Sequence, residues 1–294
     1  MPQSPSARSA SHGPEPVETL TLKARDGLPL FVRVWAPPSD MKALVAVVHG
    51  YAEHGGRYKA VASRLAEEGF GTIALDVRGH GGSGGARGYC SAFQEYLDDV
   101  DLFLKLAAER AGGKPLLLLG HSHGALILLR RLLAGPLPVK VAGAVFTSPF
   151  LGIAIPVSGM KLRAAEVLSK IMPKLSLKNE IDPALVSHDA EVVRLYATDP
   201  QVFKTANARW FTEARDAQRY VLAHAAELPI PVAFVQGGGD RIASVPSARA
   251  VAKAAGAKIR YVELDGLHHE VMNEVERERA FAEIFKSLAE YAAA

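Results

Sequence analysis

The chain has 294 residues, of which 49% are hydrophobic, and carries a formal net charge of +3. This length provides enough apolar material for a hydrophobic core, in one large domain or two smaller ones. So small a net charge gives no strong basic field, which argues against nucleic acid as a partner. The single cysteine, Cys90, excludes an intramolecular disulfide and a cysteine-based zinc site, and it fits a reducing compartment.

The N-terminal residues are rich in serine and proline and lack the apolar stretch of a signal peptide. We therefore expect a disordered tail over residues 1–16. No run of the sequence approaches the roughly 20 apolar residues that a membrane span requires. These features predict a soluble protein located in the cytoplasm.

Eight segments have the composition of β-strands, and helical patterns separate most of them. The expected strands are Val17–Lys23, Leu30–Trp35, Ala43–Val48, Gly71–Val77, Leu116–Leu119, Val141–Thr147, Pro231–Gln236 and Lys258–Leu264. The expected helices are Arg57–Glu68, Ala92–Arg110, Ala125–Leu133, Pro246–Ala255 and Glu274–Tyr291. Near-continuous apolar strands that alternate with helices indicate an α/β fold with a mostly parallel sheet, covered by helices on both faces.

The alternation stops between residues 150 and 215, where helical patterns occur without a clear strand. We interpret 150–215 as a mostly helical cap, inserted into one α/β domain that consists of residues 17–149 and 216–294. Residues 151–178 combine apolar side chains with five basic ones and a single acid, Glu166. A helix that covers an apolar pocket shows this pattern, and so does a helix that lies on an anionic membrane surface. We expect this segment to cover an apolar pocket. The second role for it is a transient contact with the membrane, as in a peripheral protein.

A Gly-x-Ser-x-Gly motif, with Ser122 at its centre, lies between the expected strand Leu116–Leu119 and the expected helix Ala125–Leu133. This is the context of a nucleophile elbow, a sharp turn that exposes a reactive serine. The glycines permit the strand and the helix to approach closely. On such a turn the neighbours of the serine point away from its hydroxyl, so neither His121 nor His123 is expected to be its base.

The acid and the base are expected on loops after later strands, in the order serine, acid, histidine. Asp240 lies in a glycine-rich loop after Pro231–Gln236 and is the candidate acid. Asp265 is the alternative, but it lies only a few residues before the candidate bases, so we expect it to stabilise the turn there instead. The base is His268 or His269, since both lie between the last strand and the last helix.

Backbone N–H groups can stabilise the oxyanion that forms when a serine attacks an ester. The N–H of His123 directly follows the nucleophile. The N–H of Tyr51 belongs to the loop after the strand Ala43–Val48, where Gly50 lets the backbone turn. We expect these two groups to form the oxyanion hole.

Several stretches of the sequence together resemble one family. They are HGYAEHGGRY, LDVRGHGGSGGARGY, GHSHG, IDPALVSHDAEVVRLYATDP, GGGDRIAS and DGLHHEVMNEVERER. The chain is similar, from about Val17 to its end, to the monoacylglycerol lipase and lysophospholipase group of the α/β-hydrolase superfamily. The resemblance implies an α/β-hydrolase fold with an eight-stranded sheet and a helical cap. It also implies that Ser122 is the nucleophile, Asp240 the acid and His269, rather than His268, the base, while Tyr51 and His123 match the oxyanion positions.

The resemblance implies a serine carboxylic-ester hydrolase, similar to monoacylglycerol lipase, that cleaves a small single-chain acyl ester without a cofactor or metal. Substrate contacts are expected in the cap and near Tyr51 and His123. The alternatives are a lysophospholipase, a general carboxylesterase, an amidase or peptidase, and a non-catalytic ligand-binding protein with the same fold. His123 stands where the family usually has methionine. We expect its side chain to make the acyl site more polar and to add a pH dependence.

Overall fold

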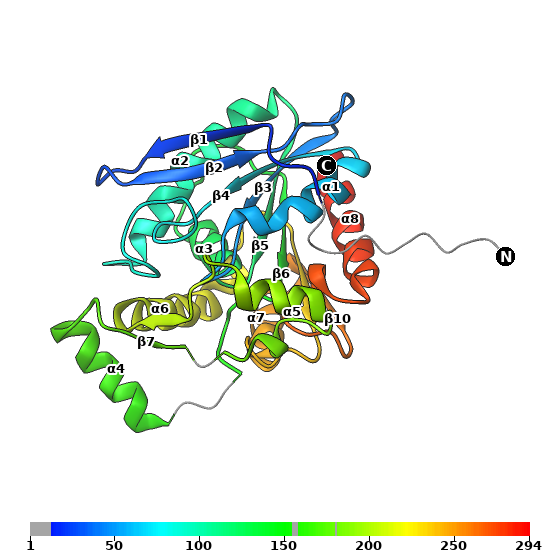
Figure 1. Ribbon diagram of the computed structural model, residues 1–294. Coiled ribbons are helices and arrows are strands. Elements are labelled where there is room, and N and C mark those ends of the chain that lie inside the picture. Colours follow the sequence, from blue (N-terminus) through cyan, green and yellow to red (C-terminus); the bar gives the residue numbers. More distant parts are fainter. Residues whose placement is uncertain (1–12, 155–157, 180) are drawn as a thin grey trace.

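A computed structural model describes residues 13–154, 158–179 and 181–294 (Figure 1). Of the expected disordered tail, residues 1–16, the first twelve lie outside the described residues. Just after it, the indole N–H of Trp35 donates a hydrogen bond of 3.0 Å to the carbonyl of Pro14. The chain is therefore tied to the core before its first strand begins.

An eight-stranded sheet forms the centre of the molecule, in the order β1-β2-β4-β3-β5-β6-β9-β10 (Figure 1). The strands β4, β3, β5, β6, β9 and β10 run parallel, whereas β1 and β2 pair antiparallel with their neighbours. The expected mostly parallel sheet of eight strands is confirmed. The bounds are β1 Glu18–Lys23, β2 Pro29–Val34, β3 Ala43–Val48, β4 Phe70–Leu75, β5 Leu116–His121, β6 Gly143–Thr147, β9 Val232–Gly237 and β10 Ile259–Leu264.

Both faces of the sheet are buried. Along β3, alternate residues belong to two different apolar clusters, one on each face, because successive side chains of a strand point to opposite sides. Helices α1 and α8 cover one face, and α2, α3 and α7 cover the other (Figure 1). The helices are α1 Lys59–Glu67, α2 Gln94–Ala111, α3 His123–Leu132, α7 Val245–Ala255 and α8 Arg277–Ala293. Three short 3₁₀ turns adjoin them: η1 Gly55–Tyr58 before α1, η4 Gly256–Lys258 after α7 and η5 Val271–Asn273 before α8.

The chain between β6 and β9 forms a separate layer beside one end of the sheet (Figure 1). It contains α4 Gly159–Ile171, β7 Ser176–Lys178, η2 Pro183–Leu185, α5 Ala190–Thr198, β8 Thr205–Asn207, α6 Ala208–His224 and η3 Ala225–Glu227. Strands β7 and β8 pair antiparallel, so the expectation of no strand in this segment is wrong. Each of the two has only three residues, too few for an alternating pattern to be visible in the sequence. Helix α6 continues past residue 215, where the insertion was expected to end.

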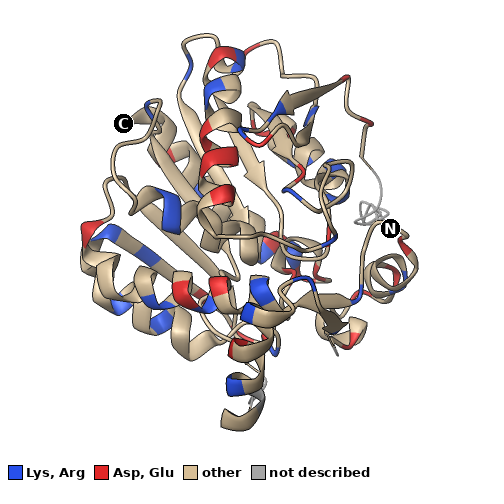
Figure 2. Ribbon diagram, turned by 90° about the vertical axis from the view of Figure 1, so that its left-hand side faces the viewer, with Lys and Arg blue, Asp and Glu red and all other residues tan. Residues whose placement is uncertain are grey.

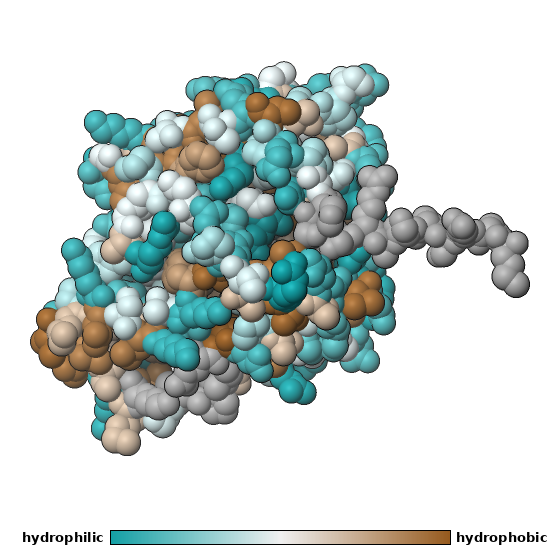
Figure 3. Space-filling model, viewed as in Figure 1, coloured by the Kyte–Doolittle hydropathy of each residue, from teal (hydrophilic) through white to brown (hydrophobic). Residues whose placement is uncertain are grey.

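Helix α4 packs on α6 and protrudes from the molecule (Figure 1). Apolar side chains gather on the surface in this region (Figure 3). The exposed ones are Met160, Val167, Ile171, Met172 and Leu177.

On the side of the molecule drawn in Figure 2, positive and negative residues are interspersed. Among the described residues, no helix has the length and apolar character needed to cross a membrane.

Candidate active site

Ser122 occupies a sharp turn between β5 and α3, with φ 49° and ψ −114°. A positive φ is strained for a residue with a side chain, and such strain is common at functional sites. Both flanking glycines are required by close packing. A Cβ added at Gly124 would lie 2.1 Å from the carbonyl oxygen of Val48, and one at Gly120 would lie 2.8 Å from the Cα of Ala125. The two glycines thus permit the close packing of β5, β3 and α3 around the turn that presents the serine.

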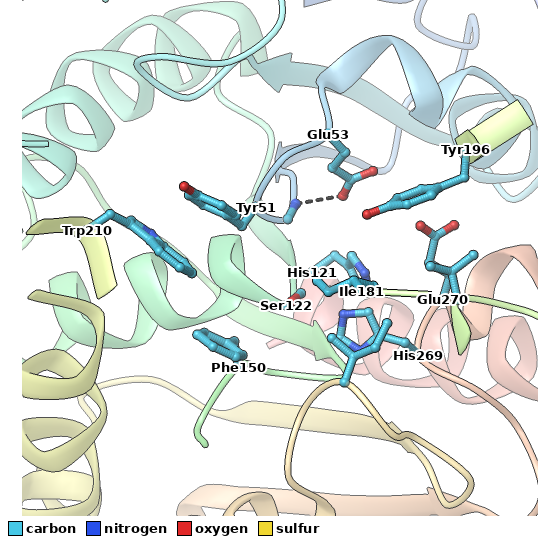
Figure 4. A pocket seen from close by; sticks show the side chains of 13 residues that line it. Tyr51, Glu53, His121, Ser122, Phe150, Ile181, Tyr196, Trp210, His269 and Glu270 are labelled. Carbon is cyan, nitrogen blue, oxygen red and sulfur yellow. Dashed lines mark hydrogen bonds between the residues drawn. The ribbon is translucent and has the colours of Figure 1, made fainter. Parts of the chain in front are cut away.

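Ser122 and His269 line the same cavity (Figure 4). One side of the cavity is aromatic. The ring of Trp210 stacks on Tyr51, with centroids 3.6 Å apart, and lies nearly parallel to Phe150. The opposite side carries polar groups, including those of Glu53 and Glu270 (Figure 4). The serine therefore lies between an apolar surface and a polar one.

Asp240 and His269 are joined by a hydrogen bond of 2.8 Å between His269 Nδ1 and Asp240 Oδ2. The other oxygen, Oδ1, accepts the backbone N–H groups of Ile242 and Ala243 at 2.8 and 2.9 Å. Burial alone would raise the pKa of Asp240, but His269 and these donors outweigh it and lower that pKa. Burial alone would lower the pKa of His269, but Asp240 outweighs it and raises that pKa. Asp265, the rival acid, is exposed.

The two histidines beside Ser122 have other partners. His121 lines the cavity, but its Nδ1 lies 3.0 Å from the hydroxyl oxygen of Thr147. Burial, together with the nearby His269, lowers the pKa of His121 to about 4. Neutral imidazole is therefore its form at physiological pH.

His123 is buried behind the cavity, and its Nε2 accepts a hydrogen bond of 3.0 Å from the indole N–H of Trp210. Burial, together with His80 and His49, holds the pKa of His123 well below its usual range. The expectation that its side chain makes the acyl site more polar and adds a pH dependence is wrong. The ring faces aromatic side chains instead of the cavity, and it remains neutral.

The backbone N–H groups of Tyr51 and His123 have no hydrogen-bond partner within the described part of the chain. His123 is the first residue of α3, where N–H groups have no acceptor inside the helix. Tyr51 follows Gly50, whose own N–H donates to Glu53 Oε1 at 2.7 Å. Among the described residues, these two backbone donors are thus free, one in the residue after Ser122 and one in the loop that follows β3.

Arg57 links the loop of Tyr51 to the loop of His269. Its guanidinium donates to Glu53 Oε2 at 2.5 Å and, in a two-point contact, to Glu270 at 2.7 and 2.8 Å. Burial alone would raise the pKa of Glu53, but Arg57 outweighs it, and this pKa falls to about 2. From the sequence, Arg57 was expected only to begin the helix Arg57–Glu68. The spacing of four residues between Glu53 and Arg57 is a pattern in the sequence that indicates an ion pair between them. The contact of Arg57 with Glu270 has no such pattern, because Glu270 lies 213 residues away.

The arrangement brings together a strained serine, a histidine with a carboxylate partner, and two free backbone donors. This set can add a serine hydroxyl to an acyl carbonyl while the histidine takes up the proton. Within the described residues, one group has side chains of the metal-ligand type, His188, His268 and Glu274, and it does not line the cavity.

Comparison with known proteins agrees with the fold. Residues 39–276 match the family described as serine aminopeptidase, S33. The monoacylglycerol lipase of Mycolicibacterium smegmatis is 33% identical, over 85% of this chain and 89% of that protein. A phospholipase of Bacillus subtilis is 29% identical, over 84% of this chain and 96% of that protein.

Among solved structures, the monoacylglycerol lipase of Paleococcus ferrophilus superimposes with a TM-score of 0.80 at 28% identity, covering 89% of this chain and 99% of that one. The match to the family, over residues 39–276, includes every strand of the sheet from β3 onward. The protein belongs to the serine aminopeptidase S33 family of α/β-hydrolases, in the group that contains the monoacylglycerol lipases.

Proposed function

We propose that the protein is a serine hydrolase of carboxylic esters, in which Ser122 is the nucleophile, His269 the base and Asp240 the acid. His269 removes the proton of Ser122 as its Oγ attacks the ester carbonyl. Asp240 holds the imidazole through Nδ1 and balances the positive charge that forms on it. The N–H groups of Tyr51 and His123 stabilise the oxyanion, a contribution that is typically worth about 10²–10³ in kcat for each donor.

Collapse of this intermediate expels the alcohol, which takes its proton from His269. The acyl group then remains on Ser122 as an ester. Water, deprotonated by the same histidine, attacks this ester and releases the carboxylic acid. Among the observations, the hydrogen bond of 2.8 Å between His269 and Asp240 in the cavity of Ser122 supports this proposal most strongly.

The substrate we propose is a monoacylglycerol, which is apolar at one end and uncharged but polar at the other. The aromatic side of the cavity, with Trp210 and Phe150, suits the acyl chain next to the ester (Figure 4). The opposite side, with Glu53 and Glu270, offers carboxylate oxygens to alcohol hydroxyl groups. Two carboxylates paired with a single arginine leave a net negative charge there. A lysophospholipid would bring its phosphate toward that charge, so this alternative is disfavoured.

A hydrolysis panel tests this substrate assignment. Monoacylglycerols, diacylglycerols, lysophospholipids and p-nitrophenyl esters of several chain lengths would be compared by kcat/KM. We expect monoacylglycerols to exceed lysophospholipids of the same acyl chain by at least tenfold, or about 1.4 kcal/mol. Equal values for the two classes would contradict the assignment, and the ester-hydrolase proposal itself fails only if none of the esters is cleaved.

We further propose that the segment from α4 to α6 acts as a cap. Four of its residues, Ile181, Val186, Tyr196 and Trp210, line the cavity. On its outer side, helix α4 presents Met160 and Ile171, with 80% and 68% of their surfaces exposed, close in sequence to exposed lysines such as Lys170. Apolar groups flanked by basic ones suit the surface of an anionic membrane. A cytoplasmic protein that contacts the membrane transiently would meet its lipid substrate there.

Co-sedimentation with anionic phospholipid vesicles tests the contact. Ile171→Glu removes an apolar anchor and adds a negative charge, and we expect it to weaken vesicle binding about tenfold or more, since a buried isoleucine is worth about 1.5–3 kcal/mol. Val275→Glu is the matched control, because Val275 is 63% exposed and lies in the loop before α8. Equal binding by the two variants would show that the protruding helix makes no lipid contact.

A further inference from the structure

His188, His268 and Glu274 each offer one ligand atom, and these three atoms all lie within 4.8 Å of one another. His188 Nδ1 is 2.8 Å from Glu274 Oε1. The Nδ1 atom of His268 is buried and has no hydrogen-bond partner among the described residues. We propose that these three side chains bind a divalent transition-metal ion such as Zn²⁺, and that the ion inhibits the enzyme. Two imidazoles and one carboxylate form a donor set that suits Zn²⁺ and its neighbours.

Glu274 is held in position before an ion arrives. Its side chain is only 2% exposed. Oε1 accepts the backbone N–H of His268 at 2.8 Å, and Oε2 accepts those of His188 and Val275 at 3.1 and 3.0 Å. Backbone donors of this kind fix the orientation of a ligand, as outer-shell partners do in metal sites. Burial alone would raise the pKa of Glu274, but these donors and His188 outweigh it, so the carboxylate stays ionised.

The two imidazoles are adjacent but not yet aimed at a common point. Their rings stack with centroids 3.7 Å apart and an angle of 29° between the planes. The side chain of His188 is 53% exposed, so its ring can turn toward the position between Nδ1 of His268 and Oε1 of Glu274. The ion would take the place of the proton that His188 shares with Glu274, and water would complete the coordination.

The site joins the cap to the loop of the proposed base. His188 lies between η2 and α5, whereas His268 directly precedes His269. The two segments are already in contact, because the N–H of Glu270 donates to the carbonyl of Val186 at 2.8 Å. An ion held by both segments would pull on the loop of His268 and so shift the adjacent His269. A displacement of about 1 Å at a catalytic group can cost about 10² in rate, so the proposed inhibition rests on the role proposed for His269.

Isothermal titration calorimetry of the full-length, untagged protein with zinc sulfate tests the binding. We expect one Zn²⁺ per chain. His188→Phe keeps a ring to stack on His268 but removes a ligand, and it should weaken binding by at least the roughly 10–100-fold that the loss of an outer-shell partner costs. His224→Phe is the matched control, because His224 also pairs with a glutamate, Glu227 at 2.9 Å, but stacks on Tyr220 instead of a second imidazole.

Hydrolysis in the presence of increasing Zn²⁺ tests the inhibition. Activity should fall with the same midpoint as binding, recover with EDTA, and resist Zn²⁺ in His188→Phe but not in His224→Phe. Lack of stoichiometric binding, or equal binding by both variants, would overturn the metal site. Binding that leaves the rate unchanged would overturn the inhibition. Since calorimetry does not depend on turnover, failure of the site is distinguishable from failure of the proposed hydrolase function.

Discussion

Alanine at position 122 is expected to lower kcat for ester hydrolysis roughly a millionfold, because it removes the hydroxyl that forms the acyl-enzyme. The change removes only the Oγ atom, so the strained turn between β5 and α3 keeps its Cβ and its packing. Ester binding should survive, and KM should change little. The measurement is steady-state hydrolysis of a monoacylglycerol by wild type and Ser122→Ala, with circular dichroism as a check on folding.

Labelling with a fluorophosphonate gives an independent test, since this reagent reacts with activated serines. Wild type should carry one adduct, on Ser122, and Ser122→Ala none. Ser148→Ala is the matched control: Ser148 also has a positive φ, of 43°, and its hydroxyl is buried with no hydrogen-bond partner in the described structure. This variant should label like wild type. A wild-type protein that takes up no label would favour a non-catalytic ligand-binding role instead.

His269→Ala should lose as much activity as Ser122→Ala, because a serine hydroxyl is a weak nucleophile until a base removes its proton. The structure predicts a contrast with the two histidines that flank the serine. His121→Asn keeps a polar group beside Thr147, and His123→Met removes only an acceptor of the Trp210 indole. Both variants should retain activity within about tenfold of wild type, as expected for the loss of one hydrogen bond of about 1 kcal/mol.

The three variants would be compared by kcat and KM on the same ester, together with their stability to urea. His269→Ala should be inactive at every pH tested, whereas His121→Asn and His123→Met should keep the wild-type pH profile. Strong activity in His269→Ala would assign the base to another residue. A loss in His121→Asn as deep as in His269→Ala would mean that the imidazole of His121 takes part in proton transfer.

Much of the fold could be predicted because its signals are local. The apolar run of β3, the turn around Ser122 and the glycine-rich loop of Asp240 each carry their information within about ten residues. The order of these motifs along the chain indicated which loops meet. A parallel sheet brings the carboxyl ends of its strands to one edge, so residues that follow different strands meet there.

The features that sequence reasoning missed depend on contacts between distant segments. The contact of Arg57 with Glu270 spans 213 residues, and that of His123 with Trp210 spans 87. The side chain of His123 was misjudged because the sequence does not reveal that Trp210, on α6, supplies its hydrogen bond. The short strands β7 and β8 escaped detection because pairing between them, rather than local pattern, defines them.

The order of the strands has a consequence for the chain during its synthesis. The nucleophile elbow at Ser122 is translated more than 100 residues before Asp240 and His269, which follow β9 and β10. With the roles proposed for these residues, a nascent chain or a prematurely terminated product that stops before β9 has neither acid nor base. Hydrolytic activity then appears only after the ribosome has translated the loop of His269, and unfinished copies that stop before it do not cleave esters.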